Sequence, residues 1–372
     1  MLYRNYHFKS LSYRLVIYVL LLTIMGILII GSAEASSQKK QIVGLIFGLI
    51  IMVIVAAIDY SYILQFHWIF YALTTIFLFM VLVLGHDSHG AKRWIKIGVR
   101  FQPSELAKIL LVLFFAWFLA KFNEELNSPK ILASIAALSA IPLLLILKEP
   151  DLSTTIVTFM VIVTMIYIAG LSKRIVKPVM SIGIPGIFIY LLFVYRTRNV
   201  LLPQYQAKRI LSWLHPEDYP KDSYQQQNSI MAIGSGLLTG KGLNTDSVTS
   251  VKNGNYIPEP QTDFIFAVAG EEMGYLGSFI IILLMFLIAF ECILIAKKAN
   301  SLSGSILCVG MASIVAYQSF VNICVVTGML PNTGLTLPFV SYGLTSLMTL
   351  YLGIGIVLNV SLQSKRYRNS RY

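Results

Sequence analysis

Long apolar blocks alternate with short polar segments along almost the whole chain. The blocks run for roughly 17 to 25 residues, and about 20 apolar residues are enough to cross the roughly 30 Å hydrocarbon layer of a bilayer. Because that layer offers no water, each segment must satisfy its own backbone N–H and C=O groups, which requires a helix. The pattern predicts an all-α polytopic membrane protein. Its ten predicted transmembrane helices lie near residues 15–31, 41–58, 67–84, 104–120, 131–147, 153–169, 178–195, 274–296, 305–326 and 342–360.

Composition and charge agree with a membrane protein. Apolar residues make up 56% of the 372 positions and charged residues 12%, whereas soluble domains carry roughly 25% charged residues. A net charge of +12 would suit nucleic acid in a soluble protein. Here the basic residues are spread over loops between spans, so they indicate anionic headgroups or an anionic substrate and no nucleic acid. Cys292, Cys308 and Cys324 lie in predicted spans and show no disulfide or metal-ligand spacing.

The distribution of Lys and Arg predicts the orientation of the chain. Ten spans place both termini on one side. If that side is the cytoplasm, its segments hold about twice as many basic residues as the short outer loops. Three polar segments then lie on the outer face: residues 85–103, the turn at 149–151 and the stretch 196–262. The last has about 67 residues and is too long to be a simple connector.

The loop before the fourth predicted span combines positive charge with a tryptophan. It contains Lys92, Arg93, Trp94, Lys96 and Arg100. One interpretation is an interfacial belt that anchors the neighbouring spans. The other is a surface that binds an anionic substrate, and for Trp94 the two interpretations stand side by side.

The fourth predicted span itself begins with two charges. Pro103 suits the first position of a helix, and Glu105 falls in the first turn, where the helix dipole favours an anion. Glu105 and Lys108 are three residues apart, so they share a helix face and can form an ion pair. A lysine at membrane depth is costly and usually functional, which favours a functional role for the pair.

Two acidic residues flank a proline between the fifth and sixth predicted spans. Glu149 and Asp151 lie on either side of Pro150. Carboxylates at the start of a span can cap the next helix. They can equally belong to a substrate site, and the sequence leaves both interpretations open.

A glycine-rich run lies within the long segment 196–262. It includes Gly234, Gly236, Gly240 and Gly242, with Lys241 between the last two. Such glycines let the backbone approach a ligand, and exposed N–H groups can cradle phosphates. The spacing is not that of a P-loop, and a flexible turn is the simpler interpretation.

The end of the long segment leads into an unusually long apolar run. Two prolines stop any helix before Thr262, so Thr262 or Asp263 is predicted to lie at a helix N-terminus. From Asp263 to Lys298 the pattern covers 36 residues, about 54 Å of helix. This length exceeds the bilayer, so the helix must project outward or break. The candidate break points are Gly270, Gly274 and Gly277. Asp263 is predicted to be either an N-cap or a catalytic carboxylate.

Residues 328–343, before the last span, contain two prolines and three glycines. Irregular backbone at membrane depth is tolerated where it is buried in protein or lines a cavity. The sequence therefore predicts that this segment forms one wall of a groove.

These segments together resemble the SEDS family of bacterial cell-wall proteins, which includes RodA, FtsW and SpoVE. The resemblance rests on Arg93 and Trp94 with residues 101–108, on residues 149–152, on 232–236 with 240–242, on 258–267, and on 330–331 with 333–343. It covers nearly the whole chain in order. It implies a single SEDS-type integral membrane domain, residues 1–372, with a long extracytoplasmic segment at about 196–262 between helices 7 and 8.

The resemblance implies a peptidoglycan glycosyltransferase of the bacterial cytoplasmic membrane. Such proteins join disaccharide-pentapeptide units from lipid II into glycan strands on the outer face, together with a class B penicillin-binding protein. The family's essential aspartate matches Asp263, and its Trp, Glu and Lys around the fourth span match Trp94, Glu105 and Lys108.

The chain departs from the usual family pattern at three positions. Ser153, Leu237 and Leu344 stand where the family commonly has Gly. Residues 240–242 are more similar to RodA, whereas residues 258–263 are similar to FtsW or SpoVE. The balance favours, weakly, RodA-type elongation over division or sporulation.

The implied reaction transfers a sugar from undecaprenyl pyrophosphate to a sugar hydroxyl. Asp263 is the expected base, kept ionised by a helix N-terminus. The departing pyrophosphate needs positive charge, for which the candidates are Arg93, Lys96, Lys108, Arg209 and Lys241. A divalent cation, Mg²⁺ or Mn²⁺, could share that task, although no metal-ligand spacing is present. The other expected substrate-site residues are Trp94, Glu105, Glu149, Asp151, Glu259, Thr262 and Ser341.

Two alternatives compete with catalysis. A lipid II flippase predicts ionisable residues through the whole depth of the bilayer, but beyond Asp59 and Glu291 the charged motifs gather on the outer side. A noncatalytic scaffold for the penicillin-binding protein predicts that Asp263→Asn leaves function intact.

Overall fold

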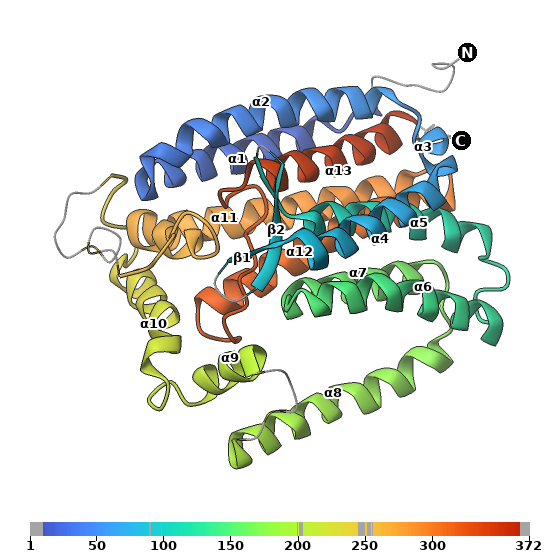
Figure 1. The fold of residues 1–372 in the computed structure, drawn as a ribbon. Helices are drawn as coiled ribbons and strands as arrows, with labels where there is room; N and C mark the ends of the chain where they lie inside the picture. The colour runs from blue at the N-terminus through green and yellow to red at the C-terminus, as the bar shows by residue number, and fades with distance from the viewer. Residues whose placement is uncertain are drawn as a thin grey trace, which may run out of the picture.

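Long helices, packed side by side, make up most of the computed structural model (Figure 1). It describes residues 10–88, 91–97, 99–198, 200, 204–244, 250, 254 and 256–364. The long helices are α1 (Tyr13–Ala33), α2 (Ala35–Ala57), α4 (His67–Leu84), α5 (Pro103–Lys121), α6 (Pro129–Lys148), α7 (Leu152–Ile168), α8 (Lys173–Thr197), α11 (Ile265–Lys298), α12 (Leu302–Val326) and α13 (Leu344–Leu362). A short helix, α3 (Tyr60–Gln65), joins α2 to α4.

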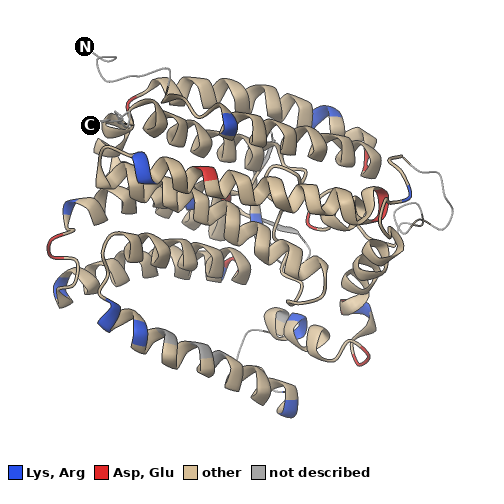
Figure 2. Cartoon of the chain, turned by 180° about the vertical axis from the view of Figure 1, so that it is seen from behind, with Lys and Arg blue, Asp and Glu red and all other residues tan. Residues whose placement is uncertain are grey.

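These ten helices coincide with the ten predicted spans. Within the described residues, nine helices are long and apolar enough to cross a membrane, and α7 is an apolar helix of 17 residues. The prediction of about ten membrane helices is therefore confirmed. The middle parts of the helices carry little charge, and most Lys and Arg lie toward the two ends (Figure 2).

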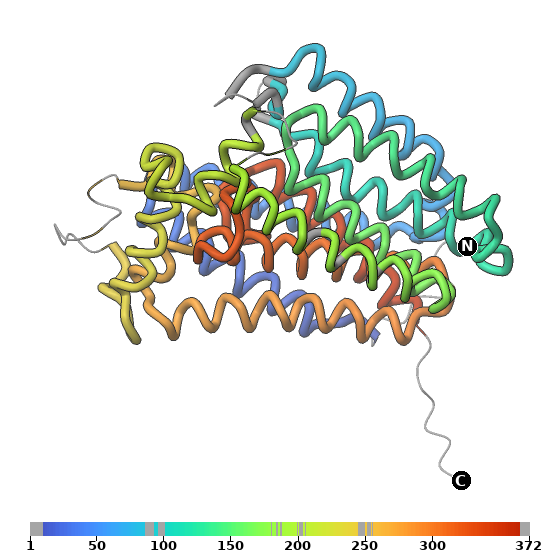
Figure 3. The backbone as a smooth tube through the Cα atoms, turned by 90° about the horizontal axis from the view of Figure 1, so that it is seen from below, coloured from blue at the N-terminus to red at the C-terminus, as the bar shows by residue number. Residues whose placement is uncertain are grey.

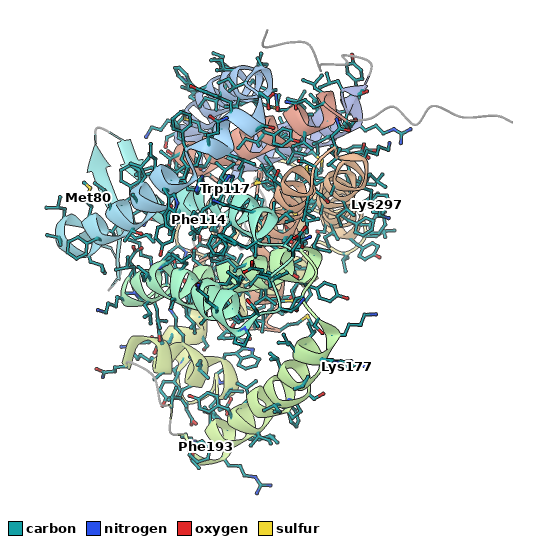
Figure 4. The ribbon with its side chains drawn as sticks, turned by 90° about the vertical axis from the view of Figure 1, so that its right-hand side faces the viewer. Met80, Phe114, Trp117, Lys177, Phe193 and Lys297 are labelled. Carbon is teal, nitrogen blue, oxygen red and sulfur yellow. The ribbon has the colours of Figure 1, made fainter. Side chains whose placement is uncertain are left out.

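The core of the bundle is formed by α5, α12 and α13, whose side chains are mostly buried. Phe114 and Trp117 of α5 lie in the interior, and the Trp117 ring stacks on His67 of α4 with 3.4 Å between ring centroids. Figure 4 shows this interior, with Phe193 and Lys177 far from it on α8. Most described side chains of α8 are exposed, and α8 lies at the edge of the bundle next to α9.

Between α4 and α5 the chain forms a small antiparallel sheet that the sequence analysis did not predict. Its strands are β1 (His86–Ser88), β2 (Ala91–Ile97) and β3 (Val99–Phe101), in the order β1-β2-β3. Trp94 pairs with His86, and Ile95 pairs with Phe101. The sheet places Arg93 in the middle of β2, at the end of the bundle where α7 begins.

The long segment after α8 is more ordered than a loop. It contains α9 (Gln204–Leu214) and α10 (Pro220–Ser235), which gather at one end of the bundle (Figure 3). α10 caps the C-terminus of α12, whose last carbonyls lack partners within the helix. Gln226 Nε2 donates to Val325 O at 2.6 Å and to Leu330 O at 2.7 Å, and Ser229 Oγ donates to Val326 O at 2.7 Å.

The long helix α11 breaks at Gly274, one of the three predicted break points. Gly274 has φ 64° and ψ −161°. The glycine-rich run lies against this break and exchanges backbone hydrogen bonds with it. Lys241 N–H donates to Glu271 O at 3.0 Å and Gly242 N–H to Glu272 O at 2.9 Å, while Tyr275 N–H donates to Leu237 O at 2.8 Å. The run therefore completes the broken helix, and the N–H groups expected to cradle phosphate at 241 and 242 are already bonded.

Candidate active site

A pocket opens where four segments meet at the α9–α10 end of the bundle. The lining residues come from β2, the α6–α7 turn with the first residues of α7, α9 and the α12–α13 loop. They are Arg93, Pro150, Leu152, Ser153, Gln206, Arg209, Ile210, Pro331, Asn332 and Thr333. Residues 331–333 thus form one wall of a pocket, as the sequence analysis expected of the segment 328–343.

Arg93 joins the small sheet to the α6–α7 turn. Its Nε donates to Glu149 O at 3.4 Å, and its Nη2 donates to Pro150 O. Its Nε lies 3.9 Å from Asp151 Oδ2. A buried guanidinium with these fixed acceptors is held rigidly, because each bond restricts the planar group.

Arg209 reaches the same pocket from α9. Its Nη1 donates to Asn332 O at 3.1 Å, and Trp213 Nε1 on the same helix donates to Gly328 O at 2.8 Å. These two bonds attach α9 to the α12–α13 loop and aim Arg209 at the pocket.

Asp263 converges with both arginines around Gly334. A Cβ built on Gly334 would lie 3.3 Å from Arg93 Nη1, 3.3 Å from Asp263 Oδ2 and 3.9 Å from Arg209 Nη1. Gly334 also has φ +73°, a conformation that L residues rarely adopt. A carboxylate and two guanidinium groups from distant segments therefore surround one point beside the pocket.

The protonation equilibrium of Asp263 is displaced. Burial raises its pKa from 3.8 to about 6, against the opposing effects of Arg93 and Arg209. The segment enters α11 through Phe264 as N-cap, with no side-chain cap bond. Asp263 therefore lies directly before the N-cap and is not the cap itself. Desolvation outweighs the nearby positive charge in setting its pKa, and a pKa of about 6 still leaves the carboxyl group mostly ionised at neutral pH.

The side chains of Asn322 and Ser341 fix the backbone around Asp263. Asn322 Nδ2 of α12 donates to Asp263 O at 2.8 Å and to Leu335 O at 2.6 Å. Ser341 Oγ donates to Thr262 O at 2.7 Å and accepts from Leu337 N at 2.7 Å. Ser341 thus supports the site through backbone groups, whereas the sequence analysis expected it to bind substrate.

The two acidic residues of the α6–α7 turn take different roles. Asp151 caps α7, since its Oδ1 accepts from Thr154 N at 3.1 Å, and it also faces Arg93. Glu149 is fully buried, and neither carboxylate oxygen has a hydrogen-bond partner within the described residues. Burial, reinforced by Asp151, raises the pKa of Glu149 to about 9. At neutral pH Glu149 is therefore an uncharged acid beneath the pocket.

The Glu105–Lys108 pair lies inside the bundle, apart from the residues that line this pocket. Lys108 Nζ donates to Glu105 Oε1 at 2.8 Å and to Gln318 Oε1 at 2.6 Å. Ser346 Oγ donates to Glu105 Oε2 at 3.2 Å. Both side chains are buried and bonded, so the predicted pairing is present and links α5 to α12 and α13.

The remaining predicted residues are more dispersed. Lys241 Nζ is bonded to Glu271 Oε1 at 2.7 Å beside the α11 break. Trp94 is half-buried in β2, and the side chain of Lys96 lies outside the described part of the chain. Glu259 is exposed, and its carbonyl accepts from Thr262 Oγ1 at 2.8 Å. Glu259 still bears on the site, because its negative charge contributes to the raised pKa of Asp263.

Sequence reasoning missed several polar residues of the pocket. Gln206 carried no signal, because it lies in a segment read as a loop. Thr333 was part of an expected wall but had no chemical role. Ser153 was noted only as a departure from a family pattern, yet its side chain lines the pocket.

One group of described side chains has the residue types and spacing that could bind a metal ion. Only His215, Glu217 and Asp218 have ligand atoms that lie together, within 4.8 Å of one another. Asp218 already pairs with Arg198 at 2.8 Å, and His215 Nε2 is 3.1 Å from Tyr195 O. This group lines no part of the arginine pocket.

The fold and site define a class: a polytopic membrane protein with an arginine-flanked carboxylate at one end of its helices. The family model described as cell cycle protein, for FtsW, RodA and SpoVE, matches residues 9–366. The chain belongs to this FtsW/RodA/SpoVE family.

Its relatives include sporulation and division proteins. It is 36% identical to stage V sporulation protein E of Bacillus subtilis, with 94% of this chain and 97% of the relative covered. It is 34% identical to a probable peptidoglycan glycosyltransferase FtsW of Geobacter sulfurreducens, with 88% and 86% covered.

Solved structures share the fold. A chain in a structure of a peptidoglycan synthase complex, described as coordinating polymerisation and crosslinking, matches with TM-score 0.76 and 27% identity, covering 94% of this chain and 97% of that chain. The rod shape determining protein RodA of Thermus thermophilus matches with TM-score 0.69 and 25% identity, covering 96% and 99%.

Proposed function

We propose that the chain is a peptidoglycan glycosyltransferase that polymerises lipid II, the undecaprenyl pyrophosphate-linked disaccharide-pentapeptide, into glycan strands for growth or division of the cell wall. The observation that carries this proposal is the convergence of Asp263, Arg93 and Arg209 around Gly334. A base and two cations at one point are what transfer from a pyrophosphate requires. The name of the FtsW relative supports the same activity.

In the proposed step, a sugar hydroxyl of one chain attacks the anomeric carbon of the sugar on undecaprenyl pyrophosphate. The new C–O bond forms as the bond from that carbon to the pyrophosphate oxygen breaks. Asp263 takes the hydroxyl proton, and a positioned base of this kind contributes roughly 10²–10⁴-fold. Arg93 and Arg209 stabilise the charge that develops on the departing pyrophosphate.

The pKa of Asp263 suits this role. A general base works best when its pKa lies just below the operating pH, so that it is ionised yet still accepts a proton. Burial brings the pKa to about 6, and ordinary aspartates lie near 3.9. The same desolvation strengthens the attraction between the two arginines and a bound pyrophosphate.

We propose that the pocket faces the outside of the cytoplasmic membrane and that both termini are cytoplasmic. The end of the bundle opposite the pocket holds a group of basic residues: Lys121, Lys130, Lys173, Arg174, Lys177, Lys297 and Lys298. Basic residues in short segments mark the cytoplasmic side. At the outer face a class B penicillin-binding protein would crosslink the strands, and the similarity to a chain of a peptidoglycan synthase complex supports such a partner.

A divalent cation is a further proposed component of the bound state. Asp151 Oδ2 is buried without a hydrogen-bond partner in the described chain, and carboxylate oxygens are the ligands that Mg²⁺ and Mn²⁺ prefer. Asp151 would hold such an ion beside the pocket, where the ion would add positive charge. Polymerisation would then fall on addition of excess EDTA and return with Mg²⁺ or Mn²⁺; an unchanged rate would exclude the ion.

The test of the function is polymerisation of purified lipid II by the full chain with its partner synthase. Asp263→Asn should lose at least about 10²-fold activity while still folding and binding the partner. The matched control is Asp218→Asn, an exposed aspartate in the same segment, which pairs with Arg198 at the surface and should retain full activity. Equal polymerisation by wild type and Asp263→Asn would refute the mechanism. Strand formation by neither would favour the flippase or the scaffold.

A further inference from the structure

Three residues that line the pocket each carry a buried polar side-chain atom with no hydrogen-bond partner in the described chain. Gln206 Oε1, Ser153 Oγ and Thr333 Oγ1 are each buried and each lack a hydrogen bond. All three residues line the same pocket as Arg93 and Arg209. Buried polar atoms are nearly always bonded in folded proteins, and unbonded ones call for a ligand, water or strain as explanation.

The three groups differ chemically from the arginines beside them. An amide oxygen needs a donor, whereas a serine or threonine hydroxyl can donate or accept. The matching ligand must therefore carry neutral donors and acceptors, as sugar hydroxyls and an N-acetyl amide do. The two guanidinium groups instead match the oxygens of a pyrophosphate.

The positions of the three residues place the neutral groups next to the arginines. Gln206 and Arg209 are three residues apart on α9, so they lie on the same face of one helix. Ser153 follows the turn that Arg93 holds through Glu149 O and Pro150 O.

We propose that Gln206, Thr333 and Ser153 form a neutral subsite that recognises the hydroxyl and N-acetyl groups of the sugar next to the pyrophosphate. This proposal rests on the proposed function, because it takes a sugar pyrophosphate as the ligand. The arginines would then bind the pyrophosphate of any undecaprenyl carrier, and the neutral groups would distinguish a carrier that bears sugar from the spent one.

The test compares two ligands that differ in the sugar. Binding of lipid II and of undecaprenyl pyrophosphate would be measured on the full chain in lipid nanodiscs. Gln206→Leu and Thr333→Val keep side-chain volume and remove the hydrogen-bonding atom. Each should weaken lipid II binding roughly 10-fold and leave undecaprenyl pyrophosphate binding unchanged. Ser153→Gly, which removes only a hydroxymethyl group, should show the smallest selective loss.

Two further variants serve as controls for the comparison of lipid II with undecaprenyl pyrophosphate. Thr74→Val removes a buried hydroxyl that bonds Phe70 O within α4, far from the pocket lining, and should leave both affinities unchanged. Arg209→Gln should weaken both ligands together. Equal loss of both ligands in Gln206→Leu and Thr333→Val would overturn the sugar subsite, and so would loss of neither. Since this assay needs no turnover, a chain that binds lipid II selectively but fails to polymerise would refute the proposed function alone.

Discussion

The charged residues around Glu105 and Lys108 and those around Arg93 and Asp263 have opposite surroundings in this molecule. In the Glu105–Lys108 group the charges are met by each other and by Gln318 and Ser346. At the pocket lined by Arg93 and Arg209, the side-chain atoms Gln206 Oε1, Ser153 Oγ and Thr333 Oγ1 have no hydrogen-bond partner in the described chain. Beside this pocket, burial raises the pKa of Asp263 to about 6. The Glu105–Lys108 group therefore links helices to one another, whereas the residues around Arg93 and Asp263 are the ones that we propose bind the substrate.

The difference shows why a charge at membrane depth is an incomplete guide to catalysis. Sequence spacing indicates that Glu105 and Lys108 can pair, and cost in the membrane indicates that they matter. Neither argument tells whether the pair serves structure or chemistry. The answer depends on whether their hydrogen bonds are complete in the fold.

The largest effect is expected from breaking the paired group. Lys108→Met should destabilise the protein by about 3–5 kcal/mol, because it leaves the Glu105 carboxylate buried and uncompensated. The double variant Glu105→Gln with Lys108→Met removes both charges and should recover most of the stability and activity. Thermal unfolding in detergent and polymerisation would be measured together. A double variant that folds normally yet stays inactive would show that the pair takes part in the reaction.

The pocket should behave in the opposite way, losing activity and not stability. Arg209→Gln removes a charge that faces the pyrophosphate, so kcat/KM should fall about 10²-fold. Its neighbour Lys208 is exposed and pairs with Asp222 at the surface, so Lys208→Gln is the matched control and should keep its activity. Comparable losses in the two variants would indicate a general effect of charge on α9.

A smaller structural effect is expected at the break in α11, which belongs to neither group. Gly240 has φ +80°, and a Cβ there would lie 2.1 Å from Glu272 O. Gly240→Ala should therefore cost roughly 1–3 kcal/mol, seen as a lower Tm. Gly234 lies in the same run, inside α10, with no atom within 4 Å of its Cβ position, so Gly234→Ala should not lower the Tm. Equal Tm values for the two variants would mean that the run does not complete the helix.

Much of the fold could be predicted because it depends on local pattern. The ten spans follow from the length of apolar blocks. A helix too long for the bilayer predicted either an outward projection or a break at one of three glycines, and the structure shows the break at Gly274. The small sheet at 86–101 has strands too short to give a clear alternating pattern. α9 and α10 are polar on average and carry no membrane signal.

The site was only partly predictable. Asp263 and Arg93 stand in motifs that the resemblance singles out, and Arg209 was a candidate for its charge. Their convergence depends on contacts between residues far apart in the chain, such as Arg209 with Asn332, 123 positions away. Gln206 could not be predicted as a site residue, because glutamine is common in polar segments and only the fold shows that this one is buried. Lys108 bonds Gln318, 210 residues away, and Glu105 bonds Ser346, 241 residues away. Neither partner could be predicted from the sequence.

The most direct test of the account is the pH dependence of kcat/KM for polymerisation of lipid II. Because burial raises the pKa of Asp263 to about 6 and only the ionised form accepts a proton, activity should rise about tenfold per pH unit below that value and level off above it. Arg209 lowers the pKa of Asp263, so in Arg209→Gln the midpoint should move to higher pH. A rate that stays constant from about pH 4.5 to 8, in wild type and in Arg209→Gln alike, would contradict Asp263 as the base.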